Sequence, residues 1–210
     1  MGFVVAVDGP AASGKGVLSE KLGRRFGWPV LDTGMLYRAV ALRALEAGVD
    51  LEDGVTLANL AAFAVAPPDD ERLRDRAVGE AASRVAAHEG VRAALVDAQR
   101  RFAAQEPGAI LDGRDIGTVI CPVAPAKIFV TATAAVRAER RWRQLAATGV
   151  TLAEVLADIE ARDRRDASRA AAPMRPAPDA VLLDTTHLDI DAAFDAALRI
   201  VEAARGGRRS

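Results

Sequence analysis

The stretch Phe3-Val-Val-Ala-Val-Asp-Gly-Pro-Ala-Ala-Ser-Gly-Lys15 decides the fold of this chain. An apolar run leads directly into Gly9-x-x-x-x-Gly14-Lys15, and a helical pattern over Lys15–Phe26 follows at once. The glycines allow a tight loop whose backbone N–H groups point at phosphate oxygens, while the helix N-terminus and the lysine add positive charge. A strand, a glycine loop and a helix in this order are typical of a phosphate-binding P-loop.

This loop differs from the usual P-loop after its lysine. Ser or Thr normally follows and gives its hydroxyl to Mg²⁺, whereas Gly16 and then Val17 follow Lys15 here. We expect Mg²⁺ to depend on nucleotide phosphates, water and a carboxylate from elsewhere in the chain, because this ion usually keeps several waters. The residues predicted to bind ATP are Gly9, Pro10, Ala11, Ala12, Ser13, Gly14, Lys15, Gly16 and Val17.

Downstream of the P-loop, short apolar runs alternate with helical patterns. This alternation predicts an α/β fold with a five-stranded parallel sheet flanked by helices, and 210 residues suit one such domain. A proline pair, Pro67-Pro68, separates the first two strand–helix units from a helical insertion that ends near Pro107. The predicted strands are Phe3–Val7, Pro29–Leu31, Ala109–Leu111, Lys127–Val130 and Val181–Leu183. The predicted helices are Lys15–Phe26, Leu36–Ala47, Arg76–Ala87, Val91–Ala104, Ala134–Ala147, Leu152–Arg164 and Ala192–Ala204.

The composition argues against several classes of function. A net charge of −1 and 4% aromatic residues provide neither the basic field nor the stacking platform of a nucleic-acid-binding protein. No apolar run reaches the roughly 20 residues of a membrane span, and the chain begins with a strand pattern instead of a signal peptide. The single cysteine, Cys121, fits a reducing cytoplasm. We expect a cytoplasmic protein that binds small molecules, and a monomer because no heptad or long apolar face is left unassigned.

Charged residues follow the predicted strands at the points where each strand ends. Arg38 lies just beyond the second strand, and Asp112, Arg114 and Asp115 follow the third. Because ligands of open parallel sheets bind at the carboxyl ends of strands, we expect these side chains to converge on one crevice. Asp112 occupies the strand-end position where P-loop enzymes place a carboxylate that organises Mg²⁺.

Further arginines recur at helical spacing in the last third of the chain. Like charges on one helix face repel unless an anion lies between them. A solvated helix face is the alternative, with Asp158 and Asp166 neutralising Arg162. A kinase whose donor and acceptor both carry phosphate explains the surplus, because arginines stabilise the charge of the transferring phosphoryl group. These arginines form two groups: Arg137, Arg140 and Arg141 in the first, and Arg162, Arg165 and Arg169 in the second.

These motifs taken together resemble the bacterial cytidylate kinases, and the likeness extends over nearly the whole chain. It implies transfer of the ATP γ-phosphoryl group to CMP or dCMP with Mg²⁺, on a P-loop kinase fold with a helical NMP-binding insertion and a lid. The implied core comprises residues 1–62, 108–136 and 170–205, the insertion about 63–107, and the lid about 137–169. The matching segments are Val7–Lys15, Leu31–Arg38, Asp112–Thr118, Arg162–Arg169, Ala172-Pro173, Ala180 and Leu183–Thr186.

The resemblance also implies a role for individual residues. Asp115 would accept a hydrogen bond from the cytosine amino group, which disfavours uracil because uracil carries a carbonyl at that position. Asp112 is the expected metal ligand. The residues implied to bind CMP are Thr33, Arg38, Ser83, Arg92, Arg114, Asp115, Arg162, Asp166 and Arg169. Those implied in catalysis are Lys15 and the lid arginines Arg137, Arg140 and Arg141.

Two departures from the family pattern leave alternatives open. Val17 removes the usual P-loop hydroxyl, which suggests a non-catalytic nucleotide-binding regulator as one alternative. The segment between Phe63 and Ser83 is too short for the β-hairpin found in many bacterial members, so the cytosine pocket would lose part of its wall. A kinase for another nucleoside monophosphate or a small metabolite is the second alternative, and only a base-reading set such as Ser83, Arg92 and Asp115 argues against it.

Overall fold

The computed structural model describes residues 2–62, 69–145 and 149–207. Its centre is a five-stranded, all-parallel sheet with the strand order β2-β3-β1-β4-β5. All five predicted strands are confirmed, with boundaries shifted by one or two residues in most cases. The strands are β1 (Phe3–Asp8), β2 (Val30–Asp32), β3 (Gly108–Gly113), β4 (Ala126–Thr131) and β5 (Val181–Asp184).

The seven predicted helices are all present. The predicted end of the fifth, at Ala147, lies outside the described residues. The helices that match these predictions are α1 (Lys15–Phe26), α2 (Thr33–Glu46), α4 (Arg76–Val85), α5 (Glu89–Ala103), α6 (Ala134–Gln144), α7 (Leu152–Ser168) and α8 (Ile190–Gly206). Thr151 and Glu154 form a reciprocal capping box at the start of α7, which explains why that helix begins where it does.

Three helical segments do not appear among the predicted elements. They are α3 (Gly54–Ala62), the 3₁₀-helix η1 (Glu71–Arg74) and the π-helix η2 (Ile116–Ile120). The α3 sequence begins with Gly, Val and Thr, which have low helix propensity, and burial of Leu57 and Ala61 against the neighbouring helices stabilises it instead. A π-helical turn has no characteristic side-chain period and is therefore not visible in a sequence.

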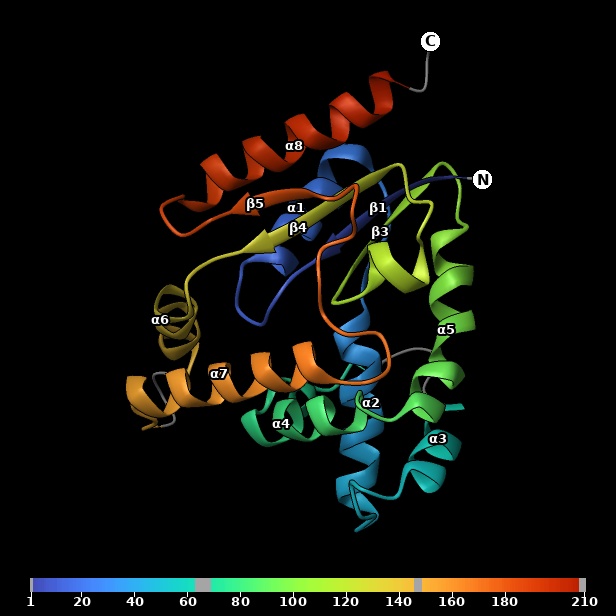
Figure 1. The fold of residues 1–210 in the computed structure, drawn as a ribbon, viewed down its shortest axis with the longest axis vertical. Helices are drawn as coiled ribbons and strands as arrows, with labels where there is room; N and C mark the ends of the chain where they lie inside the picture. The colour runs from blue at the N-terminus through green and yellow to red at the C-terminus, as the bar shows by residue number, and fades with distance from the viewer. Residues whose placement is uncertain (1, 63–68, 146–148, 208–210) are drawn as a thin grey trace.

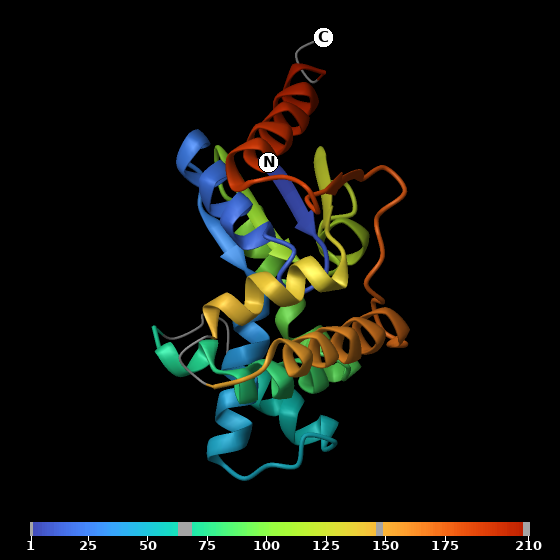
Figure 2. The same cartoon turned by 90° about the vertical axis from the view of Figure 1, so that its left-hand side faces the viewer.

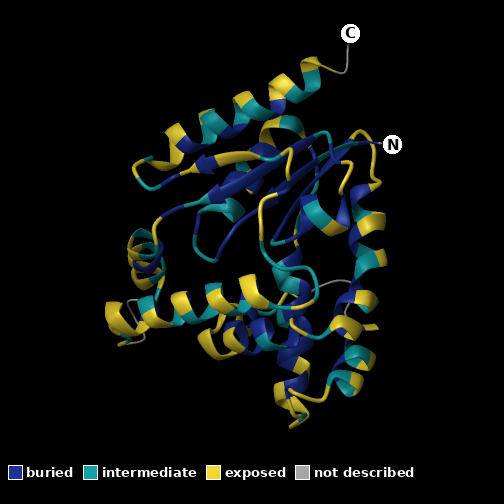
Figure 3. Cartoon of the chain, in the orientation of Figure 1, coloured by how far each residue is buried: buried dark blue, intermediate teal, exposed yellow. Residues whose placement is uncertain are grey.

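Helices cover both faces of the sheet. On one face α1 and α8 bury Leu18, Leu22, Ala197 and Val201 against β1 and β4. On the other face α5 and η2 pack through Ala103, Ile116 and Ile120. The central strands β1, β3 and β4 are correspondingly the most buried, whereas most of β5 is exposed. Exposed residues recur along α7 and α8 (Figure 3).

A second apolar cluster lies beyond the carboxyl ends of the strands. Helices α2, α3, α4 and the first half of α5 form it, through residues that include Leu36, Leu57, Val78 and Leu95. Figures 1 and 2 show this unit on one side of the molecule, the sheet on the other, and α7 lying between them. The domain boundaries remain a prediction, and α3, assigned to the core by the boundary at residue 62, packs against α5.

The insertion contains helices and no strand within its described part, residues 69–107. The expectation that the segment between Phe63 and Ser83 has no room for a hairpin stays a prediction, because residues 63–68 lie outside the described residues. The proline pair that was predicted to open it, Pro67-Pro68, lies outside the described residues.

Candidate active site

The P-loop connects β1 to α1 with the backbone geometry that its glycines allow. Gly9 and Gly14 have φ values of 149° and 91°, and a Cβ on Gly9 would lie 2.0 Å from the Val130 carbonyl oxygen. Ala12 also has a positive φ of 59°, which is unfavourable for a residue with a side chain. Gly14 is the N-cap of α1 and has no side chain to occupy the first amides of the helix. The loop is therefore built to present free N–H groups to an anion.

Lys15 and Asp112 form an ion pair beneath this loop. The pairing of β1 with β3 places Asp112 opposite Val7, and Lys15 Nζ lies 3.6 Å from Asp112 Oδ1. Burial lowers the pKa of Lys15 and raises the pKa of Asp112 to about 6, and the attraction between the two groups opposes both shifts. Both side chains are nearly inaccessible, so the pair supplies one cation and one carboxylate in a region of low dielectric.

A cavity of about 610 Å³ opens in front of the P-loop, between α2, α4 and α7. Burial and the nearby Arg114 guanidinium lower the pKa of Arg162 to about 10, and the Arg162 Nε atom has no hydrogen-bond partner among the described residues. Burial and Arg141 likewise lower the pKa of Arg38. Converging cations with depressed pKa values indicate a site that an anion would stabilise. The cationic residues that line the cavity are Lys15, Arg38, Arg76, Arg114, Arg141 and Arg162.

A smaller and more enclosed cavity continues behind it, beside Tyr37, Ser83 and Arg92. Asp115 is buried there between two arginines: it accepts a hydrogen bond from Arg92, and its Oδ1 lies 3.6 Å from Arg169 Nη2. All of the predicted CMP ligands line one or both of these two cavities. The structure therefore brings together side chains that lie up to 136 positions apart in the sequence, from Thr33 to Arg169.

Asp166 is the second carboxylate of this buried network. It accepts from Arg114 Nε at 3.0 Å and from Ser83 Oγ at 3.3 Å, and Arg162 Nε lies 3.9 Å away. Burial raises the pKa of Asp166, but Arg114, Arg162 and Arg169 outweigh that effect and the pKa is lowered overall. Two carboxylates and four arginines make the network positive, so it suits a ligand that carries negative charge and hydrogen-bonding groups.

The predicted lid arginines have different surroundings. Arg141 lines the large cavity. Arg137 is buried and donates to the Ala11 carbonyl of the P-loop at 3.2 Å and to Asp163 at 2.6 Å. Arg140 donates to Thr185 Oγ1 at 3.0 Å, and the same hydroxyl lies 3.2 Å from the Ser13 carbonyl oxygen. Two of the three arginines thus support the P-loop backbone in this structure, and their catalytic role remains a prediction.

Sequence reasoning assigned no role to three residues of this region. Tyr37 lines the small cavity, and the Arg92 guanidinium lies 5.5 Å from its ring centroid. Asp163 and Thr185 hold the arginines of α6. The position of Tyr37, the only tyrosine of the chain and the residue before Arg38, was an available signal. The contacts of Asp163 and Thr185 depend on how α6 packs, for which the sequence carries no signal.

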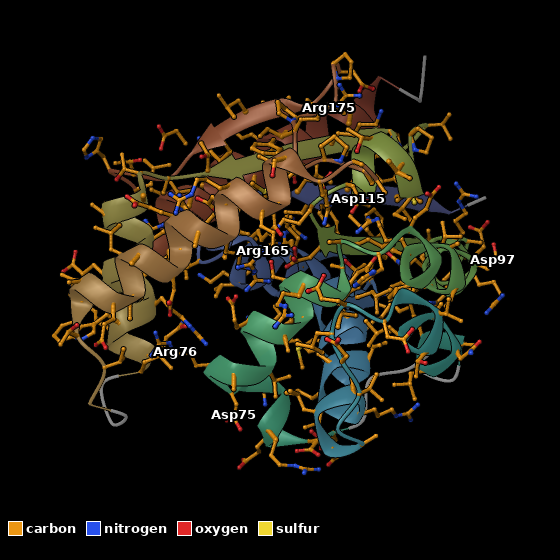
Figure 4. All side chains as sticks on the ribbon, turned by 60° about the horizontal axis from the view of Figure 1, so that its bottom comes forward. Asp75, Arg76, Asp97, Asp115, Arg165 and Arg175 are labelled. Atoms are coloured by element: carbon orange, nitrogen blue, oxygen red, sulfur yellow. The ribbon has the colours of Figure 1, made fainter. Side chains whose placement is uncertain are left out.

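Two ion pairs join α4 to α7 beside the large cavity. Arg76 Nε lies 2.6 Å from Asp158 Oδ2, and Arg165 Nη2 lies 2.7 Å from Glu80 Oε1. Figure 4 shows Arg165 on α7 facing α4, with Asp115 deeper in the molecule toward the sheet. Arg76, Glu80 and Asp158 of these pairs line the large cavity.

We expect the double variant Glu80→Gln/Asp158→Asn to raise the KM of the acceptor nucleotide about two- to thirtyfold, because two exposed pairs that contribute about 0.2–1 kcal/mol each total about 0.4–2 kcal/mol. Steady-state kinetics at low ionic strength measure this change. The matched control is Glu52→Gln, which breaks the exposed pair with Arg84 without touching α7. Equal KM values for the double variant and the control would contradict a role for the α4–α7 pairs in closing the cavity.

The family model described as Cytidylate kinase matches residues 5–203 of the chain. The chain belongs to the cytidylate kinase family. It is similar to the cytidylate kinase of Caulobacter sp. (strain K31), with 59% identity over 98% of this chain and 96% of the relative. It is also similar to the cytidylate kinase of Xanthobacter autotrophicus (strain ATCC BAA-1158 / Py2), with 58% identity over 98% of this chain and the whole relative. The predicted family is therefore confirmed.

A solved structure supports the fold assignment alone. An uncharacterized protein from Eubacterium ventriosum superposes with a TM-score of 0.55 over 96% of this chain and 99% of its own, at 13% sequence identity.

Within residues 2–62, 69–145 and 149–207, no helix combines the length and the apolar character needed to cross a bilayer. Among the same residues, no three His, Cys, Asp or Glu side chains gather as a ready-made metal site.

Proposed function

We propose that the chain transfers the γ-phosphoryl group of ATP to CMP or dCMP and forms ADP with CDP or dCDP. The observation that carries this proposal is the enclosed cavity around Asp115, which adjoins the arginine-lined cavity of a P-loop in a member of the cytidylate kinase family. A carboxylate at the end of a buried pocket is suited to accept from the exocyclic amine of cytosine and to reject the carbonyl of uracil.

The proposed mechanism needs no general base. The α-phosphate of CMP is already an anion at neutral pH, and one of its oxygens attacks the γ-phosphorus while the bond to the β–γ bridging oxygen breaks. Lys15 and the P-loop amides hold the β- and γ-phosphates, and Arg38, Arg114 and Arg162 hold the acceptor phosphate. Arg141 neutralises charge on the transferring group. The cavity mouth between α4 and α7 limits the access of water, which disfavours hydrolysis of ATP.

The residues at the P-loop fit a Mg²⁺ ion that arrives with ATP. Asp112 lies at the carboxyl end of β3, and a Cβ on Gly16 would lie 3.4 Å from its Oδ2 atom, so the glycine leaves the space beside that buried oxygen free of side-chain atoms. Asp112 would hold the ion together with nucleotide oxygens and water. When bound, Mg²⁺ neutralises charge on the phosphates.

Val17→Thr tests whether the absent P-loop hydroxyl matters. Val17 lies in the first turn of α1 and is 40% exposed, so a hydroxyl fits there without repacking. We expect the Mg²⁺ concentration for half-maximal activity to fall about twofold at most, because Mg²⁺ keeps several waters in such sites. A Mg²⁺ titration at saturating nucleotides measures it, with Val17→Ala as the control for removing the valine alone. A larger fall would mean that the natural chain lacks a ligand it needs.

A substrate panel tests the proposed function. ADP release from Mg-ATP is measured with CMP, dCMP, UMP, AMP and GMP as acceptors. Turnover with CMP and dCMP well above the others is expected. Activity with another acceptor would keep the assignment as a kinase and change the proposed acceptor. Inactivity with every acceptor would favour a nucleotide-binding regulator. We also expect a cytoplasmic protein that requires no nucleic acid. It should be a monomer, which sedimentation of the purified protein with and without CMP would test.

A further inference from the structure

Asp8 joins the P-loop strand to the loop that carries Asp115. It is the last residue of β1 and directly precedes Gly9. Its Oδ1 atom accepts a hydrogen bond from the Ile116 amide at 2.8 Å, and its Oδ2 atom accepts one from the Gly117 amide at 2.7 Å. Both amides begin the π-helix η2, immediately after Asp115.

The two amides depend on this carboxylate. They lie in the first turn of η2, where N–H groups have no partner within the helix, and both residues are buried. The Asp115 carbonyl accepts from the Val119 amide at 2.9 Å and the Ile120 amide at 3.2 Å. The backbone at Asp115 is therefore fixed twice. Amides of η2 donate to the Asp115 carbonyl oxygen, and Asp8 accepts from the two amides that follow Asp115.

Apart from these two amides, only the charge of the more distant Arg114 stabilises the buried Asp8 carboxylate within the described part of the chain. Among the described residues no cation lies within ion-pair distance of its carboxylate. Burial and the neighbouring Asp115 carboxylate raise the pKa of Asp8 to about 6, while the two amides and Arg114 lower it. At pH 7.5 the group is ionised, so both of its oxygens can accept. An asparagine would avoid the cost of burying this charge, but its NH₂ group would face one of the two N–H donors.

We propose that Asp8 is a positioning residue for cytosine selection, which sets the direction of the Asp115 carboxylate through the first amides of η2. This inference rests on the proposed function of the Asp115 pocket. It assigns to the end of β1 a role on the acceptor side of the site, in addition to leading into the P-loop on the donor side.

The test compares Asp8→Asn with the wild type at pH 7.5 in the kinase assay. We expect the ratio of kcat/KM for CMP to that for UMP to fall about tenfold, mainly through a higher KM for CMP, because a small misplacement of a positioning group has effects of this size or larger. The KM for ATP is expected to change less than twofold. Calorimetric titration with CMP in the absence of ATP provides a second readout that does not depend on turnover.

Two further variants make the test decisive. Asp189→Asn is the matched control, because Asp189 accepts from two backbone amides at the start of α8, outside the acceptor pocket. Gly117→Ala tests the same contact from the other side, since its Cβ would lie 3.3 Å from Asp8 Oδ2 and 3.2 Å from Lys127 Cδ. Gly117→Ala should lower the preference for CMP over UMP as Asp8→Asn does. If Asp8→Asn does not fold, the kinetics of Gly117→Ala decide the test.

The outcomes separate this inference from the proposed function. A wild-type protein that does not phosphorylate CMP would overturn both. An active wild type whose CMP preference survives within twofold in a folded Asp8→Asn or Gly117→Ala variant would overturn the inference alone. An equal rise in the KM values for ATP and CMP would also overturn it, because Asp8 would then act on the P-loop and not on Asp115.

Discussion

Replacing Lys15 with Met is expected to lower kcat about 10³-fold while the protein remains folded, because a preorganised charge on the transferring group typically contributes about 10²–10³-fold or more. The methionine keeps the length of the side chain and removes the cation that lies 3.6 Å from Asp112. Asp112 then loses its ion-pair partner, and its pKa is expected to rise further above 6. Initial rates with Mg-ATP and CMP measure the fall in kcat, and a thermal melt shows whether the protein remains folded.

Lys21→Met provides the control for this variant. Lys21 lies on the same helix, but it pairs with the exposed Asp191 at the other side of α1 and does not line either cavity. Its replacement is expected to leave kcat within twofold of the wild type. If Lys15→Met retained near-normal turnover while folded, the assignment of the loop as the donor phosphate site would be wrong.

Asp115→Ala is expected to have the second largest effect. The change leaves Arg92 and Arg169 buried without their shared carboxylate, and breaking a buried charge network in this way costs about 3–5 kcal/mol of stability. The KM for CMP should rise about 10²-fold, and the preference for CMP over UMP should largely disappear, since loss of a buried polar contact to a substrate group has effects of this order or larger. Kinetics with both acceptors and chemical unfolding measure these changes.

The loss of stability has to be separated from the loss of selectivity. Asp179→Ala also leaves a buried cation without its carboxylate: it removes the ion-pair partner of Lys127, and neither residue lines either of the two cavities. This control should be destabilised and keep its CMP preference. Asp115→Asn keeps the shape of the side chain and adds an N–H donor, so it should accept UMP better than Asp115→Ala does. An unchanged CMP to UMP ratio in either Asp115 variant would remove this residue from base recognition.

The order of secondary structure was predictable because it depends on local patterns. Each strand of the sheet is a short apolar run, and α1 begins and ends at the predicted residues, between Gly14 and Gly27. In contrast, α3 was missed because its stability comes from packing on α5 and not from its own residues. The π-helix η2 was missed because its geometry depends on amides held by Asp8, a residue that lies 108 positions before Ile116.

The candidate site shows the same division. The chemistry could be read from the residues alone: a P-loop, a strand-end carboxylate and a surplus of arginines at helical spacing, in an arrangement that resembles one kinase family. Which arginine meets which carboxylate depends on the folded chain. Arg92 and Arg169 converge on Asp115, whereas Arg137 and Arg140 turn to the P-loop backbone. The physical reason is that side-chain identity and periodicity are properties of neighbouring residues, while ion pairs and buried hydrogen bonds depend on the packing of elements that are distant in the chain.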